Sequence, residues 1–239
     1  MRISIVPLLT IAVSKQNYNI RNAVCFLVCL MLLGIIVPLI IGKPFHLSEE
    51  ILNRAEQKYG GSVRKRLIAW EDLINSNTGN TDQEKLGKVN NFFNRMEYVE
   101  DIVLWHQEDY WATPIEFLGK QAGDCEDYTI SKYFTLKAMG VGDEKLNLTY
   151  VKSLTFGVYH MVLAYYPTPG GEPLILDNYV TDVLPASKRT DLLPVYSFNG
   201  TGLWLAKQRG RGKLAGNSSS RLKRWQDVME KMTEDNLGQ

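Results

Sequence analysis

The sequence predicts an α+β protein in which helices come first and an antiparallel sheet follows. Between residues 48 and 96, apolar side chains recur every three or four positions, which is the spacing of one face of a helix. Between residues 148 and 206, short runs rich in β-branched and aromatic residues are separated by turn-forming Gly, Pro and Asn. A further helical pattern, which opens at Cys125, lies between these two regions. This succession of helices and then strands is typical of the α+β class.

The first 43 residues differ in composition from the rest of the chain. Residues 23–42 carry no charge, are flanked by Arg21 and Lys43, and are long enough for one helix to cross a bilayer. The same segment is also compatible with a secretory signal peptide that has a long, charged N-terminal region. We therefore expect residues 1–43 to be a signal peptide or a membrane anchor, and residues 44–239 to form a domain outside the cytoplasm.

Composition and cysteine content narrow the classes of function. The formal net charge is +1, and no basic face or recognisable motif stands out, which argues against nucleic acid as a partner. Membrane contact is expected only through residues 1–43, if that segment is retained. Cys25 and Cys29 lie in the apolar segment, so Cys125 is the one cysteine of residues 44–239. A disulfide framework needs paired cysteines and is not expected there.

Three helices are expected ahead of Cys125. The first spans Ser48–Tyr59 and ends at a Gly-Gly pair. Ser62 is the expected N-cap of the second, and Thr81 with Glu84 forms a capping box for the third. The apolar stripes of the second and third helices are assigned to the core; they are Val63, Leu67, Trp70 and Ile74, and then Leu86, Val89, Phe93 and Met96.

The segment that leads to the cysteine has no clean period. Residues 104–123 are therefore expected to be irregular or extended. Within this segment Trp105 is assigned to the core, whereas Trp111 is expected to be exposed.

The second half of the chain is expected to hold five strands, with a hairpin turn at residues 168–171 between the second and the third. A basic linker rich in Gly and Ser, residues 207–220, precedes a final amphipathic helix whose apolar stripe includes Trp225 and Met232. The expected strands are 148–151, 157–166, 173–178, 195–198 and 203–206.

Cys125 opens a helix that is expected over residues 125–139, with Asp124 as its N-cap. Asp124, Glu126 and Asp127 surround the cysteine, and their negative charge disfavours the thiolate on which cysteine chemistry depends. Either Cys125 is a buried and inert residue, or other groups offset this charge. The dipole of the first helical turn and a nearby imidazolium would both do so.

His160 lies in the middle of an expected strand, where a histidine is either a hydrogen-bonded structural residue or a catalytic base. His160 and Asp177 are equally far from the expected hairpin turn, so a regular hairpin sets them directly opposite each other on one face of the sheet. Asp177 would then accept the Nδ1–H of the imidazole and leave Nε2 to face Cys125. A cysteine at a helix N-terminus, with such a histidine and acid, is the arrangement of nucleophilic cysteine catalysis.

Around these three residues the motifs "GDCEDY", "YHMVLA" and "LILDN" resemble those of the bacterial transglutaminase-like cysteine proteinases, in particular the LapG-type periplasmic proteases. The resemblance covers the chain from about Ser48 to the final helix. It implies a core like that of papain and transglutaminase, with Cys125 as the nucleophile, His160 as the base and Asp177 as the orienting acid.

The resemblance also implies dependence on calcium held by acids around the cysteine, which here are Asp124, Glu126 and Asp127. From the residues alone, three acids within four positions are compatible with helix capping by itself. They are equally compatible with capping combined with calcium, which takes about six to eight oxygen ligands.

The implied function is calcium-dependent cleavage of a large surface adhesin near its N-terminus, at a paired-alanine site, which releases cells from a biofilm. The implied inhibitor is an inner-membrane receptor that sequesters the protease when it has bound cyclic di-GMP. Two alternatives remain open. The same triad serves a transglutaminase or amidase that transfers an acyl group to an amine, and a non-catalytic binding module would use the fold without the chemistry.

Overall fold

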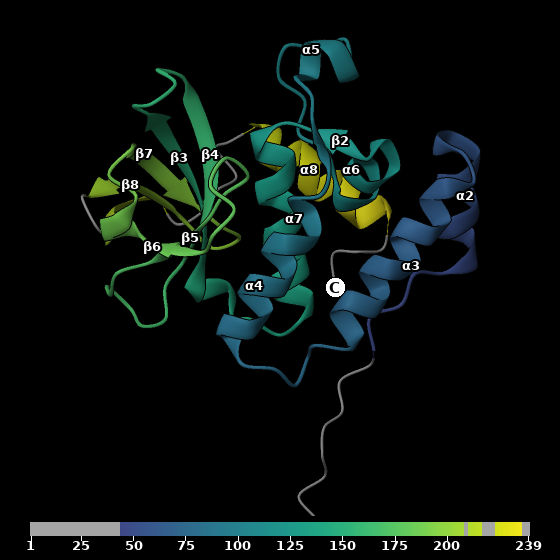
Figure 1. The fold of residues 1–239 in the computed structure, drawn as a ribbon, viewed down its shortest axis with the longest axis horizontal. Coiled ribbons are helices and arrows are strands. Elements are labelled where there is room, and N and C mark those ends of the chain that lie inside the picture. Colours follow the sequence, from purple (N-terminus) through teal and green to yellow (C-terminus); the bar gives the residue numbers. More distant parts are fainter. Residues whose placement is uncertain (1–43, 208–209, 217–222, 236–239) are drawn as a thin grey trace, which may run out of the picture. The chain divides into compact units, whose positions relative to one another are not determined.

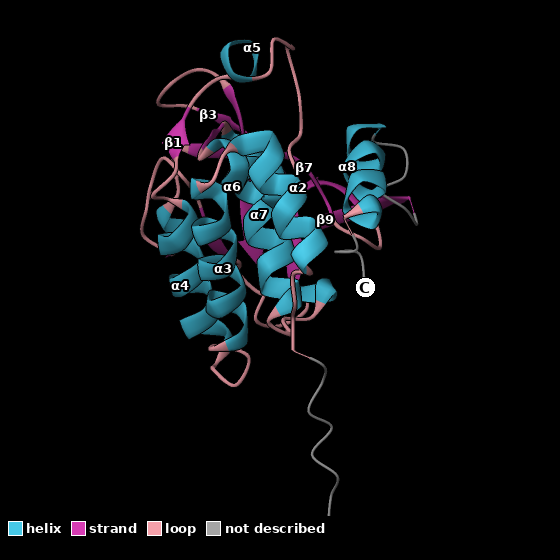
Figure 2. Ribbon diagram, turned by 90° about the vertical axis from the view of Figure 1, so that its right-hand side faces the viewer, coloured by secondary structure: helices cyan, strands magenta, loops and turns pink. Residues whose placement is uncertain are grey.

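The computed structural model describes residues 44–207, 210–216 and 223–235. The expected signal peptide or anchor, residues 1–43, lies outside these described residues. Among the helices that are described, none combines the length and the apolar character needed to cross a bilayer. The α+β class is confirmed: a layer of helices lies on one side of an antiparallel sheet (Figure 1), and Figure 2 shows the same helices in front of the strands.

The first three described helices are α2 (Glu49–Tyr59), α3 (Ser62–Asn75) and α4 (Asp82–Phe93). The capping box before α4 is confirmed, because Thr81 and Glu84 exchange hydrogen bonds between side chain and backbone. The expected cap of α3 is wrong. Gly61 is the N-cap, and Ser62 already lies in the first turn, where its hydroxyl accepts a hydrogen bond from Arg66.

The segment expected to be irregular or extended, residues 104–123, contains the short helix α6 (Pro114–Lys120) and the strand β2 (Ala122–Gly123). The short helix α5 (Asp101–Leu104) ends where this segment begins, and β2 pairs in parallel with β1 (Glu97–Tyr98). The helix α6 begins with a capping box between Thr113 and Glu116 and has Pro114 at its first position. Both signals are visible in the sequence, but a helix of about two turns is too short to show a helical period.

The helix α7 (Cys125–Ala138) packs against the sheet, as Figure 1 shows. Within the described residues the sheet has the order β6-β5-β4-β3-β7-β8-β9. Its strands are β3 (Leu146–Ser153), β4 (Tyr159–Tyr165), β5 (Leu174–Leu176), β6 (Leu184–Pro185), β7 (Leu192–Phe198), β8 (Leu203–Lys207) and β9 (Gly210–Gly216).

The strand β9 corrects the expectation of a linker over residues 207–220. Gly210–Gly216 pairs with β8 at the edge of the sheet. Glycine disfavours strands in isolation, so this strand depends on the hydrogen bonds that β8 offers. The final helix, α8 (Lys223–Glu234), follows the expected amphipathic pattern. Its Trp225 is buried and stacks on Phe134 of α7, with ring centroids 5.6 Å apart.

The main core lies between the helices and the inner face of the sheet. Trp70 of α3 is fully buried there and donates a hydrogen bond to Thr135 of α7 (2.7 Å). Trp111, which the sequence suggested was exposed, belongs to this core instead: it is 9 % exposed and stacks on Phe198 of β7. Burial of a large aromatic ring stabilises the folded state, whereas the same ring on the surface would stay in contact with water.

Candidate active site

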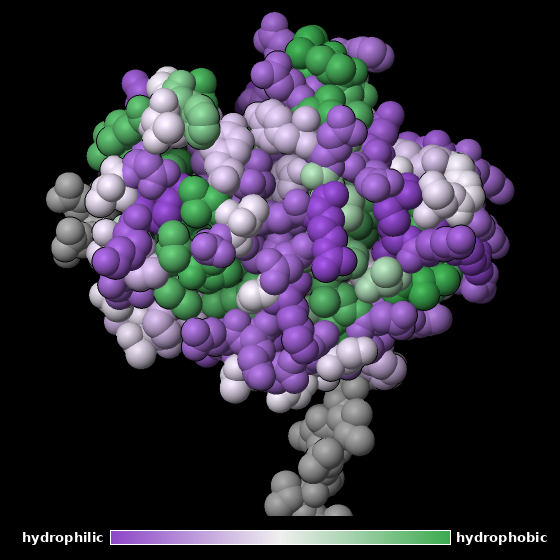
Figure 3. All heavy atoms as spheres, viewed as in Figure 1, coloured by the Kyte–Doolittle hydropathy of each residue, from purple (hydrophilic) through white to green (hydrophobic). Residues whose placement is uncertain are grey.

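A cleft of about 750 Å³ opens between the helical layer and one end of the sheet, and Cys125 lies in its wall. Exposed apolar side chains form both lips. Ile102 projects from α5, and Phe156 and Val158 project from the turn between β3 and β4. Figure 3 shows these two hydrophobic areas, with a hydrophilic hollow between them.

Local structure fixes the position of Cys125 at the start of α7. The short parallel pair of β1 and β2 ends at Gly123, whose carbonyl accepts a hydrogen bond from Val99 (2.9 Å). A Cβ at Gly123 would collide with Asp127 and lie 2.8 Å from the ring of Phe117, so the chain requires glycine here. Asp124 is then the N-cap, as expected, and its backbone N–H donates to Asp127 Oδ2 (3.4 Å).

The structure brings His160 and Asp177 together. The Nε2 of His160 lies 2.7 Å from Asp177 Oδ1, and both side chains are buried. Asp177 is held further by the guanidinium of Arg189, at 2.7 Å from Oδ2, and by the backbone N–H of Tyr179, at 3.0 Å from Oδ1. Burial alone would raise the pKa of Asp177, but the hydrogen bond from His160 and the neighbouring positive charges outweigh it and lower this pKa to about 2.

Two details of this pair differ from the sequence-based prediction. The register of β4 and β5 pairs Leu163 with Leu176, so it would continue to set Tyr179, rather than Asp177, opposite His160. The turn between the strands is centred about one residue later in the chain than expected, because Tyr165 pairs with Leu174. The displacement is two residues, so Asp177 stays on the same face. From this diagonal position it meets Nε2 rather than Nδ1, and Nδ1 is the nitrogen that remains free to face another group.

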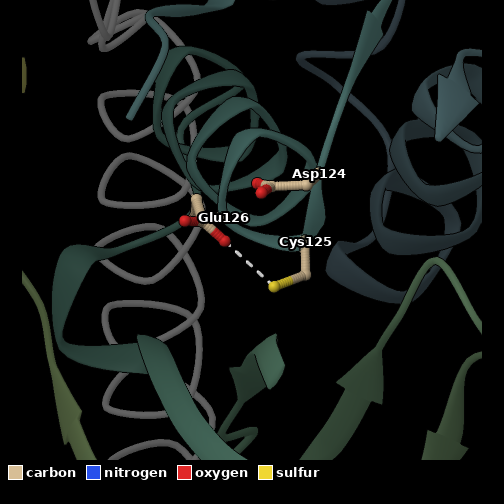
Figure 4. A group of neighbouring side chains, drawn as sticks. All are labelled: Asp124, Cys125 and Glu126. Atoms are coloured by element: carbon tan, nitrogen blue, oxygen red, sulfur yellow. Dashed lines mark hydrogen bonds between the residues drawn. The ribbon is translucent and has the colours of Figure 1, made fainter. Parts of the chain in front are cut away.

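The first turn of α7 is tied to β4 next to His160. The hydroxyl of Thr129 lies 2.9 Å from the carbonyl oxygen of Cys125 and 3.0 Å from that of Met161. The thiol of Cys125 does not bond to His160; it donates to Glu126 Oε2 at 3.0 Å, as Figure 4 shows. His160 Nδ1 is buried and has no hydrogen-bond partner among the described residues. Thr129 therefore ties the turn that carries Cys125 to the strand that carries His160.

Beside the thiol lies a cluster of acids that is larger than the sequence indicated. Asp124 and Glu126 belong to it, and Asp101 and Asp109 join from the segment before α6. Asp127 lies at its buried edge, where its carboxylate accepts backbone hydrogen bonds from Ala112 and Asp124. Two sets of three carboxylates each bring one oxygen per residue within 4.8 Å of the others; they are Asp101, Asp124 and Asp127, and Asp101, Asp109 and Glu126. Sequence reasoning missed Asp101 and Asp109 because they are 15 or more positions away from Cys125 and only the fold brings them near.

The cluster has unsatisfied acceptors and strongly perturbed acids. Asp101 Oδ1 and Asp124 Oδ1 are buried without a hydrogen-bond partner. Burial, followed by the neighbouring carboxylate of Glu126, raises the pKa of Asp124 to about 10. Burial also raises the pKa of Glu126, to about 7, although hydrogen bonds with Cys125 and Asp124 oppose the rise. Burial, followed by the carboxylates of Glu126 and Asp124, raises the pKa of the Cys125 thiol. Crowded carboxylates with free oxygens fit a hard divalent cation, which would offset the charge that opposes thiolate formation.

Comparisons with known proteins identify the family. The model of the bacterial transglutaminase-like cysteine proteinase family matches residues 70–205. A solved structure of Legionella pneumophila LapG is 46 % identical to this chain, with a TM-score of 0.68, and the match covers 79 % of this chain and 99 % of that one. A comparison with curated proteins returned no match.

Two further structures of Legionella pneumophila LapG are also 46 % identical. The one described as EGTA-treated has a TM-score of 0.69, and the match covers 79 % of this chain and 99 % of that one. The one described as calcium-bound has a TM-score of 0.65, with 77 % and 98 % covered. Identity at this level over nearly the whole of the other chain extends well beyond the short motifs. This chain therefore belongs to the bacterial transglutaminase-like cysteine proteinase family and is a cysteine peptidase of the LapG type.

Proposed function

We propose that this protein is a calcium-dependent endopeptidase of the periplasm, with Cys125 as nucleophile, His160 as general base and Asp177 as the acid that orients His160. One observation carries the proposal. A buried His160–Asp177 pair leaves Nδ1 without a partner beside the helix turn that presents Cys125 to an open cleft. A histidine oriented in this way, close to a thiol, is the requirement for cysteine nucleophilic catalysis.

The proposed reaction proceeds through a thioester. Nδ1 of His160 takes the proton of the Cys125 thiol, and Sγ attacks the carbonyl carbon of the scissile peptide bond. The first-turn N–H groups of α7 point toward the developing oxyanion and stabilise it. The imidazolium returns the proton to the leaving amine as the C–N bond breaks. His160 then removes a proton from water, which attacks the thioester and releases the carboxylic acid and the thiol.

Asp101, Asp109, Asp124 and Glu126 are the residues that would hold calcium, and Asp127 would support them from the buried edge of the cluster. Bound calcium would supply positive charge that opposes the raised pKa of the thiol. Glu126 would have two roles, because its carboxylate is one of these acids and also accepts the hydrogen bond of the Cys125 thiol. The Legionella pneumophila LapG structures described as calcium-bound and as EGTA-treated support calcium as the ion.

We further propose that the substrate is the N-terminal region of a large surface adhesin, whose cleavage promotes biofilm dispersal. The proposed regulator is an inner-membrane receptor for cyclic di-GMP that sequesters the enzyme. The similarity to LapG supports both proposals, and an open cleft with apolar lips suits an extended polypeptide. Residues 1–43 would direct export to the periplasm, either as a cleaved signal peptide or as an anchor.

The test uses the purified full chain and a recombinant N-terminal region of such an adhesin. Cleavage is expected with calcium, is expected to stop with EGTA, and is expected to return with added calcium but not with zinc. Cys125→Ala should abolish cleavage and leave the far-UV circular dichroism spectrum unchanged. Calcium should also raise the melting temperature of Cys125→Ala, because a ligand that binds only the folded state stabilises it.

Three results would contradict the proposal. Cleavage by Cys125→Ala would exclude Cys125 as the nucleophile. Cleavage in EGTA would exclude a calcium requirement, and the acids around Cys125 would then serve only as helix caps. In a parallel assay with a glutamine donor and a primary-amine probe, amine incorporation that exceeds peptide cleavage would favour an acyl transferase instead.

A further inference from the structure

The imidazole of His160 has a second neighbour besides Asp177. The ring of Tyr179 lies parallel to it, with an interplanar angle of 4° and a centroid separation of 4.1 Å. This contact follows from the observed register, which would continue to set Tyr179 opposite His160. Because His160 is fully buried, the tyrosine ring forms one wall of its site and fixes the plane in which the imidazole lies.

Tyr179 also acts on the carboxylate that holds His160. Its backbone N–H donates to Asp177 Oδ1 at 3.0 Å, and this is the oxygen that contacts His160 Nε2 at 2.7 Å. One residue therefore constrains both partners of the pair: its backbone orients the carboxylate and its ring orients the imidazole. An aromatic face also attracts the cationic form of a stacked ring.

The ring of Tyr179 is itself held from two sides of the cleft. Its hydroxyl lies 3.4 Å from that of Tyr98 in β1, and its ring meets Phe156, in the turn after β3, at 5.1 Å and 69°. All three side chains line the cleft that contains Cys125. Through Tyr98 and Phe156, the ring stacked on His160 contacts two sides of the cleft in which a substrate would lie.

We propose that Tyr179 is a positioning residue that sets the plane of the His160 imidazole, so that Nδ1 points toward Cys125. This inference rests on the catalytic roles proposed above for Cys125 and His160. The aromatic ring, rather than the hydroxyl, provides the positioning, because the stacked contact involves the ring face.

The test compares Tyr179→Leu with Tyr179→Phe in the full chain with calcium. Both variants keep the backbone N–H that bonds Asp177, so only the ring contact differs between them. Tyr179→Leu is expected to lower kcat by roughly ten- to a hundredfold with little change in KM, because small misplacements of a catalytic group cost rates of this size. Tyr179→Phe should restore kcat to within about threefold of the parent value.

A second readout does not depend on activity. The sequence contains three histidines, so the ring protons of His160 can be assigned by nuclear magnetic resonance with the help of His46→Gln and His106→Gln. In the parent chain and in Tyr179→Phe these protons should be shifted upfield by the ring current of the stacked aromatic. In Tyr179→Leu they should return toward ordinary values. Tyr59→Leu, the same substitution in α2 outside the cleft, should leave both kcat and the His160 signals unchanged.

The outcomes separate this inference from the proposed function. If Cys125→Ala is inactive and Tyr179→Leu keeps the parent kcat, the positioning role is wrong and the catalytic assignment stands. If Tyr179→Leu raises KM and leaves kcat unchanged, Tyr179 contacts substrate only, and the inference is again overturned. Activity in Cys125→Ala would overturn the proposed function, whereas the His160 signals would still show whether Tyr179 holds the ring.

Discussion

Replacement of Asp177 by Asn tests the electrostatics of the site most directly. The substitution removes one charge and keeps the size of the side chain. Asp177 is 1 % exposed and contacts His160 and Arg189, each at 2.7 Å, as well as the backbone N–H of Tyr179. Its carboxylate therefore stabilises the fold and, in the proposed mechanism, also orients the base.

The size of the effect follows from the lowered pKa. Burial opposes ionisation of Asp177, and the hydrogen bond and charges around it reverse that effect, so that its pKa falls from 3.8 to about 2. Such a shift corresponds to about 2.5 kcal/mol in favour of the charged form in the folded state. Asp177→Asn cannot provide this stabilisation. We expect its free energy of unfolding at pH 7 to be about 2 to 3 kcal/mol lower than that of the parent chain.

The dependence on pH gives the sharper test. Because the pKa of Asp177 is lower in the folded than in the unfolded chain, its stabilisation is present above about pH 4 and is lost as the pH falls through about 2. The stability difference between the parent chain and Asp177→Asn should therefore shrink by about 1 kcal/mol between pH 5 and pH 3. At pH 2 the reduction should reach about 2 kcal/mol.

The assay is urea unfolding followed by far-UV circular dichroism at pH 7, 5, 4, 3 and 2, with EGTA present throughout. Asp191→Asn is the matched control, because Asp191 pairs with the same Arg189 but is partly exposed and does not contact His160. Its stability loss should be smaller. The kcat of Asp177→Asn should fall by about 10²- to 10⁴-fold. A stability difference that stays constant from pH 7 to pH 3 would refute the electrostatic account.

Two further predictions concern buried charges near the site. In Glu126→Gln, the Cys125 thiol should react faster with iodoacetamide than in the parent chain, measured in EGTA at pH 7. The reason is that the substitution removes a negative charge that raises the pKa of the thiol. An unchanged rate would show that Glu126 does not hold the thiol. Lys132 is fully buried, and burial lowers its pKa from 10.5 to about 7. Below about pH 10 the unfolded chain therefore binds the proton of Lys132 more tightly than the folded chain does, and this difference destabilises the folded state. Lys132→Met should raise the free energy of unfolding by about 2 kcal/mol at pH 6, after allowance for the lost hydrogen bond to Asn94, and this gain should shrink as the pH rises from 7 to 10. Urea unfolding at pH 6, 8 and 10 measures it, and a gain that grows with pH would contradict the argument.

Parts of the site were readable in the sequence because they depend on short-range rules. Capping residues mark where helices begin, which placed Thr81 before α4 and Asp124 before α7. The alternation of side chains along a strand placed His160 and Asp177 on one face, and this conclusion survived an error of two residues in the register. The resemblance of the three motifs to a family was confirmed by the comparisons.

Other features depended on how distant segments pack. The sequence alone does not say where the turn between β4 and β5 is centred. That position decides whether Asp177 or Tyr179 lies opposite His160, and hence which imidazole nitrogen faces the acid. The short helices α5 and α6 and the edge strand β9 carry little periodicity of their own, so tertiary contacts determine them. Asp101 and Asp109 reach the acidic cluster only because the segment before α6 folds over Asp124.

By itself, the sequence determined the order of the elements, the cysteine at a helix start and the shared face of His160 and Asp177. The periodicities of helix and strand are local, because each depends on a few residues that are neighbours in the sequence. Only the tertiary structure decided which groups surround Cys125: the bond to Glu126, the added acids and the ring stacked on His160. Burial and charge depend on distances between residues that are far apart in the chain, and those distances exist only once the helices have packed against the sheet.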